Sequence, residues 1–130
     1  MQKKKFIKSF STVSLMKILI VDDDKLIREL LKIILKDFEV YEAENGREAV
    51  EVYKKVKPDI VLMDVLMPNM NGIEATKEIL KIDQNAKIIG VTAFASSKGQ
   101  ELLKAGAKEI IEKPFTRKKI IEIVKKYSGP

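Results

Sequence analysis

The chain contains neither cysteine nor histidine, and these two absences narrow the chemistry that it can perform. Without cysteine there is no disulfide, and without both residue types a structural zinc site lacks its usual ligands. The absence of histidine also removes the commonest general base, any Ser-His or Cys-His nucleophile pair and any phosphohistidine carrier. Chemistry in this chain therefore depends on carboxylates, hydroxyls and lysines.

Long hydrophobic runs are absent as well. No apolar stretch approaches the roughly 20 residues of a membrane-spanning helix, so we expect no membrane partner. The lack of cysteine fits a reducing compartment, and we expect a cytoplasmic protein. A length of 130 residues suits one ordinary domain, which is large enough to bury a hydrophobic core without the help of a disulfide or a structural metal.

The net charge of +6 is concentrated at one end of the chain. Four lysines lie within residues 1–15 and no acidic residue accompanies them, which leaves +2 for the remainder. Global charge therefore does not favour nucleic acid as a direct partner. Residues 1–15 have no signal-peptide pattern, so we interpret them as a disordered basic leader or as sequence upstream of a true start at Met16; a basic contact arm is the alternative.

From Met16 onward, short apolar runs alternate with longer stretches at helical spacing, which predicts βα units and a parallel sheet. The expected strands are residues 17–21, 40–43, 60–63, 87–91 and 109–112, and the expected helices are residues 25–36, 47–56, 73–82, 98–105 and 116–127. The first helix is expected to have a broad apolar face of Leu26, Ile27, Leu30, Leu31, Ile34 and Leu35. Gly106 is expected to end the fourth helix in a left-handed conformation.

The first, third and fourth strands are almost wholly apolar, which predicts helices on both faces of a doubly wound α/β sheet. The second strand alternates and is expected at an edge. Ligands of such sheets bind beyond the carboxyl ends of the strands. Right-handed crossovers would gather at that rim the polar residues that follow the strands, namely Asp22, Asp23, Asp64, Thr92 and Lys113.

Two or three carboxylates from neighbouring strand ends repel one another unless a cation lies between them. Oxygen ligands without histidine or cysteine favour Mg²⁺. A magnesium ion beside an exposed aspartate, with a lysine and a threonine opposite, suits stabilisation of a transferring phosphoryl group. Asp64 would then be the nucleophile that forms an acyl phosphate. Taken singly, Thr92 is an ordinary strand-end hydroxyl, Lys113 is an ordinary exposed lysine and Asp24 is a helix cap.

The order Val21-Asp22-Asp23, Met63-Asp64 with Met67-Pro68 and Asn71-Gly72, Val91-Thr92-Ala93 and Lys113-Pro114-Phe115 resembles the receiver domain of response regulators in two-component signalling. The resemblance covers essentially residues 16–128 and is closest to stand-alone chemotaxis regulators. It implies a flavodoxin-like (βα)5 fold with strand order 2-1-3-4-5.

The resemblance also implies a role for each site residue. Asp64 would take a phosphoryl group from the phosphohistidine of a sensor histidine kinase. Asp22, Asp23, Asp64 and the Leu66 carbonyl would hold Mg²⁺, directly or through water. Thr92 would bond a phosphoryl oxygen and swing inward, and Lys113 would pair with another oxygen. The Lys113-Pro114 bond is expected to be cis, and the kinase is expected to dock beside the first helix and residues 114–116.

The sequence departs from this family at the switch, because Ile110 stands where Tyr or Phe is frequent. We therefore expect Ile110 to be packed and the signal to pass through residues 92–97 and the fourth helix. Leu66 and Phe94 lie two residues beyond Asp64 and Thr92. By resemblance, such bulky apolar neighbours hinder the attacking water and predict a comparatively long-lived phosphoryl group.

These features predict a signalling domain rather than a classical enzyme, acting on a downstream protein target, with self-dephosphorylation slow. The alternatives are a phosphorelay shuttle and, less favoured, an aspartate-nucleophile phosphohydrolase that uses Asp22-x-Asp24. The chain ends one helix after Lys113, so we expect no output domain, and phosphorylation-dependent dimerisation stays open. We also expect one basic surface on the last two helices, composed of Lys104, Lys108, Arg117, Lys118, Lys119, Lys125 and Lys126, although a solvated face is favoured over an acidic partner.

Overall fold

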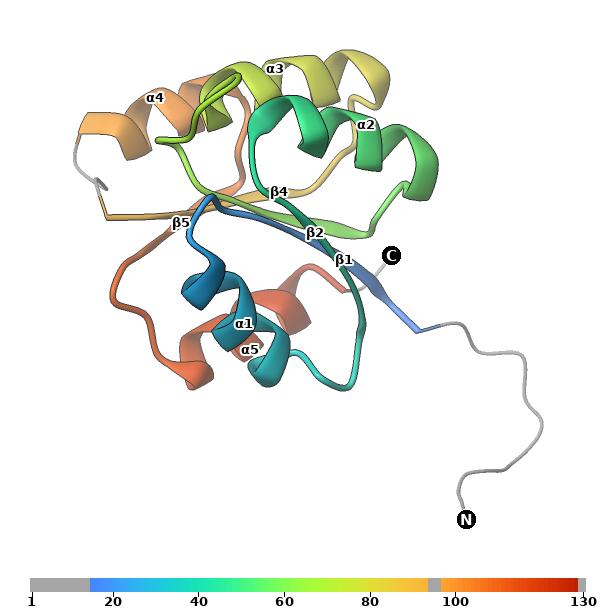
Figure 1. The fold of residues 1–130 in the computed structure, drawn as a ribbon, viewed down its shortest axis with the longest axis vertical. Coiled ribbons are helices and arrows are strands. Elements are labelled where there is room, and N and C mark those ends of the chain that lie inside the picture. The colour runs from blue at the N-terminus through green and yellow to red at the C-terminus, as the bar shows by residue number, and fades with distance from the viewer. Residues whose placement is uncertain (1–14, 94–96, 129–130) are drawn as a thin grey trace.

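The computed structural model describes residues 15–93 and 97–128 and has five parallel strands alternating with five helices (Figure 1). The strands are β1 (Lys17–Val21), β2 (Glu39–Ala43), β3 (Ile60–Met63), β4 (Ile88–Thr92) and β5 (Glu109–Glu112). The helices are α1 (Lys25–Ile34), α2 (Gly46–Val56), α3 (Gly72–Ile82), α4 (Ser97–Ala105) and α5 (Arg117–Lys126). All ten elements expected from the sequence are present, with ends that differ by at most two residues.

The sheet has the order β2-β1-β3-β4-β5, which confirms both the flavodoxin-like topology and the edge position of β2. Figure 1 shows α2, α3 and α4 on one face of the sheet and α1 and α5 on the other. In each βα unit the helix returns the chain to the end of the sheet at which the strands begin, so all five strands run in the same direction and their carboxyl ends lie at one rim.

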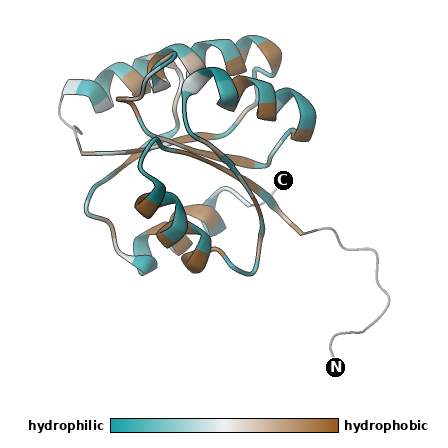
Figure 2. Ribbon diagram, in the orientation of Figure 1, coloured by the Kyte–Doolittle hydropathy of each residue, from teal (hydrophilic) through white to brown (hydrophobic). Residues whose placement is uncertain are grey.

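The apolar strands are buried on both faces, as their continuous hydrophobic runs predict. Successive side chains of β1 alternate, so that Leu19 and Val21 join the core under α2, α3 and α4 while Ile18 and Ile20 join the core under α1 and α5. The hydropathy colouring of Figure 2 shows the corresponding division of each helix into hydrophobic and hydrophilic parts. Two cores therefore hold the strand ends in a fixed arrangement.

Local sequence signals define the helix ends. The side chains of Asp24, Asn45, Asn71 and Thr116 accept hydrogen bonds from first-turn N–H groups of α1, α2, α3 and α5, respectively. Asn71 and Glu74 form a reciprocal capping box. Gly106 follows α4 with φ of 122°, which confirms the expected left-handed residue.

The expected apolar face of α1 is wrong in part. Leu26 and Leu30 are exposed, at 78% and 44%, and so is Ile33 at 65%, whereas Arg28 is buried together with Leu31 and Ile34. Apolar residues surround most of this helix in sequence, so periodicity alone does not select the side that faces the sheet.

The residues of the expected basic surface on α4 and α5 come from both faces of the sheet. These two helices lie on opposite faces of the sheet, with the edge strand β5 between them (Figure 1). On α5, Lys126 forms an ion pair with Glu109 of β5, whereas Arg117, Lys118 and Lys125 line a hollow beside the loop that precedes β2.

Within the described ranges, no helix is long and apolar enough to cross a membrane. Of the leader, only Leu15 lies within the described residues, and it is exposed. Phe94 lies outside the described residues, as does most of the expected signalling segment between Thr92 and Ser97.

Candidate functional site

The polar residues that follow the strands meet at the carboxyl-end rim of the sheet. Val21 of β1 and Met63 of β3 are partners in register, so Asp22 and Asp64 leave the sheet side by side. The backbone pairing continues past the strand ends: the Asp64 N–H donates to Val21 O at 2.9 Å, and the Lys113 N–H donates to Thr92 O at 3.0 Å. Asp64 is therefore held by the central strands and not by a free loop.

Three carboxylates form the acidic part of the rim. One oxygen from each of Asp22, Asp23 and Asp64 lies within 4.8 Å of the other two. Asp22 and Asp64 are buried, whereas Asp23 is exposed. An oxygen-only set at this spacing fits a hard divalent cation that retains several waters, and so fits Mg²⁺.

Asp24 does not join this cluster. Its side chain is exposed and accepts the Leu26 N–H at 2.9 Å, as expected for the cap of α1. Its own N–H donates to Asp22 Oδ1 at 2.9 Å. The run Asp22-Asp23-Asp24 therefore divides into two rim carboxylates and one cap.

Lys113 supplies the positive charge opposite these carboxylates. Its Nζ lies 2.7 Å from Asp22 Oδ2 and 3.5 Å from Asp64 Oδ2. Burial alone would lower the pKa of Lys113, but the hydrogen bond to Asp22 and the charges of Asp64 and Asp22 raise it above its usual value. The lysine is therefore a cation in contact with both buried acids. The Lys113-Pro114 peptide bond is cis, as expected.

The environment of Asp64 disfavours its negative charge. Burial is the largest cause that raises the pKa of Asp64, and the neighbouring Asp22 carboxylate raises it further. Lys113 and a hydrogen bond from the Val65 N–H to Asp64 Oδ1, at 2.8 Å, act in the opposite direction without cancelling the rise. A bound divalent cation would relieve this repulsion, which supports the fit of the site to Mg²⁺.

The other predicted residues surround this centre. Thr92 is the last residue of β4 and is fully buried. Leu66 is 48% exposed, two residues beyond Asp64. Ile110 is partly buried and packs against the core, with its Cδ1 facing Gly90 of β4. The expectation that Ile110 is packed is thus confirmed.

Sequence reasoning missed the backbone hydrogen bonds that join the loop after Asp64 to the start of α2. The N–H groups of Gly46 and Arg47, in the first turn of α2, donate to Met70 O at 2.9 Å and Asn69 O at 3.2 Å. Asn69 and Met70 both have positive φ, at 50° and 80°. The Pro68-Asn69 sequence signals a turn, but no sequence pattern indicates that α2 holds it.

Arg28 was missed as well. Its guanidinium Nη1 donates a hydrogen bond to the Asp22 carbonyl oxygen at 2.7 Å. Its spacing from Leu31 places both residues on one side of α1, but the sequence pattern did not identify that side as the one that faces the sheet.

The fold and this acidic rim are those of a receiver, and comparison with known families agrees. The chain belongs to the response regulator receiver domain family, whose family model matches residues 18–125. It is a CheY-like receiver domain of two-component and chemotaxis signalling, a signalling domain rather than a classical enzyme.

Individual relatives support this assignment. The chain is 53% identical over 116 residues to the chemotaxis protein CheY of Thermotoga maritima, covering 86% of this chain and 97% of the relative. Among solved structures, the CheX–CheY–BeF3–Mg complex of Borrelia burgdorferi has a TM-score of 0.83 at 33% identity, covering 88% of this chain and 90% of that one. The receiver domain of a Pseudomonas aeruginosa sensor histidine kinase, solved with magnesium in its active site cleft, has a TM-score of 0.84 at 28% identity, covering 90% and 100%.

Proposed function

We propose that this chain is a phosphorylation-controlled switch in which Asp64 accepts a phosphoryl group from a phosphohistidine of a partner kinase. The observation that carries the proposal is the buried Asp64 carboxylate, placed beside Asp22, Asp23 and the Lys113 ammonium at the sheet rim. Asp22, Asp23 and Asp64 would hold Mg²⁺, together with the Leu66 backbone carbonyl. The bound cation would neutralise charge on the acceptor and on the phosphoryl oxygens.

In the proposed transfer, an Asp64 carboxylate oxygen attacks phosphorus, the phosphorus–nitrogen bond breaks, and the imidazole of the kinase leaves with the bonding electron pair. The Lys113 ammonium would leave its contacts with Asp22 and Asp64 and form an ion pair with a phosphoryl oxygen. Thr92 would bond another oxygen through its hydroxyl. Both contacts form only with the phosphoryl group in place, so they stabilise the transferred charge and report the modification.

The signal would leave the site through the segment that follows Thr92. Thr92 ends β4 and α4 begins at Ser97, so a shift of Thr92 reaches α4 through four intervening residues. Ile110 packs against the same strand at Gly90 and would repack with it in place of an aromatic toggle. Amide chemical shifts of α4 that remain unchanged on phosphorylation would contradict this path.

For the kinase, we propose a docking surface on α1. Leu26, Leu30 and Ile33 are exposed at a spacing of four and three residues, which places them on one side of the helix. The helix starts directly after the acidic residues, so a partner bound there would have its phosphohistidine near Asp64. Exposed apolar side chains in such a row indicate contact with a partner helix.

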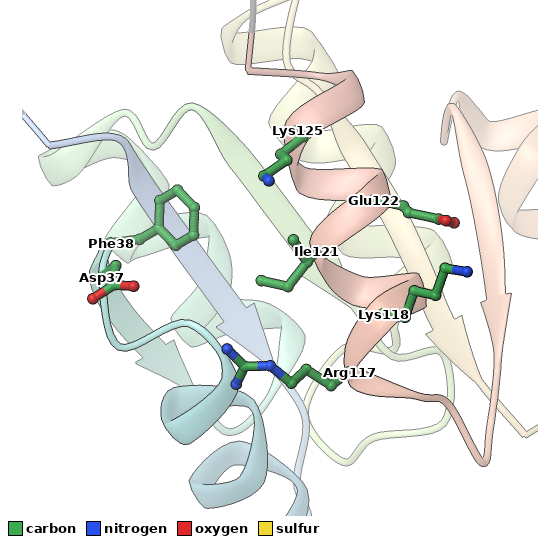
Figure 3. Close-up of a pocket in the computed structure, with 7 residues that line it drawn as sticks. All are labelled: Asp37, Phe38, Arg117, Lys118, Ile121, Glu122 and Lys125. Atoms are coloured by element: carbon green, nitrogen blue, oxygen red, sulfur yellow. The ribbon is translucent and has the colours of Figure 1, made fainter.

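A hollow of about 500 Å³ lies between the loop after α1 and helix α5 and would extend this surface. Figure 3 shows Phe38 and Ile121 facing each other across it, with Arg117 and Lys125 on the α5 side. We propose that the kinase also contacts this hollow. The downstream protein target would use other surfaces after phosphorylation.

Leu66 supports a proposal about the lifetime of the phosphoryl group. Its apolar side chain is half exposed beside the acceptor loop, where it would hinder the approach of water to an acyl phosphate. We expect Leu66→Asn to shorten the lifetime, alone or with Phe94→Glu. Phosphate release at the wild-type rate in both variants would show that these positions do not control access.

A phosphorelay shuttle remains the second candidate, because the α1 surface would serve any protein that carries a phosphohistidine. Return of the phosphoryl group from Asp64 to a second histidine-bearing protein would distinguish it. The phosphohydrolase alternative loses support, because the Asp24 that its Asp22-x-Asp24 pattern requires caps α1 and lies outside the acidic cluster.

The decisive experiment is intact mass after incubation with acetyl phosphate and Mg²⁺. We expect one added phosphoryl group in the wild type and in the exposed-aspartate control Asp37→Asn, and none in Asp64→Asn or after chelation of the metal. Retention of the adduct by Asp64→Asn would refute the assigned acceptor. Rapid release of phosphate over many turnovers would instead favour the phosphohydrolase.

A further inference from the structure

Arg28 is the one buried basic residue within residues 15–93 and 97–128, with 7% of its surface exposed. A buried cation is costly unless charged or polar partners surround it, so its position on the inner side of α1 requires an explanation. Neither the phosphoryl transfer nor the docking surface described above uses this side chain. Its partners lie at the edge of the acidic cluster.

The guanidinium joins three elements of the fold. From α1, its Nη1 donates to the carbonyl oxygen of Asp22, at the end of β1, at 2.7 Å. Its Nε donates to Glu42 Oε1, on the edge strand β2, at 2.9 Å. Lys32, one turn further along α1, contacts the other Glu42 oxygen at 2.9 Å. Burial would raise the pKa of Glu42, but the hydrogen bonds from Lys32 and Arg28 outweigh it, so this carboxylate stays charged.

These contacts complete the restraint of Asp22. Its N–H donates to Ala43 O at 3.1 Å, its Oδ1 accepts the Asp24 N–H, and its Oδ2 accepts Lys113 Nζ. The Asp22 carbonyl belongs to the peptide that links Asp22 to Asp23, and Arg28 donates a hydrogen bond to its oxygen. Movement of this peptide would displace both the Asp22 and the Asp23 carboxylate.

We propose that Arg28 is a positioning residue of the cation site, which anchors the peptide between Asp22 and Asp23 to Glu42 of β2 and so sets the separation of the two carboxylates. The inference rests on the proposed function in that it takes the cation to be Mg²⁺. Arg28 does not touch the ion. A planar guanidinium reaches a carbonyl and a carboxylate in two directions at once, whereas a lysine ammonium is a single point charge on a flexible stem.

The test is the Mg²⁺ affinity of the full chain, measured by titrating Mg²⁺ and following the amide resonances of Asp23, Asp24 and Val65. Groups that orient metal ligands typically contribute about 10- to 100-fold to affinity. We expect Mg²⁺ to bind about 10-fold more weakly to Arg28→Met, with partial recovery in Arg28→Lys. The exposed Arg47 of α2 provides a matched control, because it contacts the loop after Asp64 through its backbone N–H, which a change of side chain retains, and Arg47→Met should bind as the wild type does.

A second readout needs no metal. The Asp24 amide donates to Asp22 Oδ1, so its hydrogen exchange should become faster in Arg28→Met if the anchored peptide loosens. Should Arg28→Met fail to fold, Glu42→Gln takes its place. It keeps an acceptor for Arg28 but removes the charge, and should weaken Mg²⁺ binding about two- to threefold.

Two results would overturn the assignment. These are equal Mg²⁺ affinity in the wild type and the folded variant at position 28 or 42, or an equal loss in Arg47→Met. Failure of the wild type to bind Mg²⁺ would instead refute the metal site of the proposed function, so the two failures are distinguishable.

Discussion

Replacement of Gly72 by alanine tests how tightly the acceptor residue is packed. Gly72 is the first residue of α3, and a Cβ built on it lies 1.9 Å from the carbonyl oxygen of Asp64 and 3.0 Å from the Cα of Val65. The Gly72 N–H also donates to Val65 O at 2.8 Å, so the two backbones are already in contact. Moving the new methyl group out to 3.0 Å from that oxygen would require a displacement of about 1.1 Å.

The obstacle is backbone and not the end of a flexible side chain, so the cost should fall near the upper part of the range for overpacking, about 3 kcal/mol. The better helix propensity of alanine returns up to about 1 kcal/mol. The net loss of about 2 kcal/mol corresponds to a fall in Tm of roughly 7–9 °C for a domain of this size. A shift of about 1 Å at Asp64 should also slow phosphorylation by acetyl phosphate by up to about 100-fold.

Thermal unfolding and intact-mass kinetics measure the two effects. Gly90→Ala is the matched control, because its added methyl group meets only the side-chain ends of Leu102 and Ile110, which can rotate away. We expect it to lose less stability and to keep phosphorylation within a few-fold of the wild type. Wild-type Tm and phosphorylation rate in Gly72→Ala would refute the view that α3 is packed against the acceptor backbone.

Three further predictions concern stability. The pKa of Asp64 is raised in the folded state, chiefly by burial and then by Asp22, so the stability that its protonated form contributes is complete below the unfolded pKa near 3.8 and is lost as the pH rises through the folded pKa. Asp64→Asn should therefore be more stable than the wild type at pH 7, on the order of 1 kcal/mol, and should lose this advantage below pH 3.8. Denaturant unfolding at a series of pH values would check this. Lys57 is exposed and ends α2 with φ of 49°, so Lys57→Gly should gain about 0.5–1 kcal/mol in urea unfolding, whereas the control Lys55→Gly inside the helix should lose about 1 kcal/mol; a loss in both would contradict the left-handed cap. The buried hydroxyl of Thr76 has no hydrogen-bond partner within the described residues, so Thr76→Val should raise the free energy of unfolding by about 1 kcal/mol, and a fall in Tm would show that the hydroxyl is bonded.

Much of the site could be read from local sequence because its residues stand at the ends of strands. A continuous apolar run that stops at Asp22, Asp64 or Thr92 defines both a buried parallel strand and the residue at its carboxyl end. Parallel topology then brings those ends to one rim without any knowledge of side-chain contacts. The helix caps Asp24, Asn71 and Thr116 are equally local, since each bonds to an N–H two or three residues away.

The remaining features depend on which surfaces meet. Helix α1 is apolar on most sides, and only its packing against the sheet decides that Arg28 lies inward while Leu26 and Ile33 face outward. The positive φ of Met70 is accepted because the first turn of α2 binds its carbonyl, across more than twenty residues of chain. The sequence by itself determined the strands, their polar ends and the order in which they occur; the tertiary structure alone decided the burial of Arg28, the exposed row on α1 and the separation of α4 from α5, because long-range contacts select among faces that the local pattern leaves equivalent.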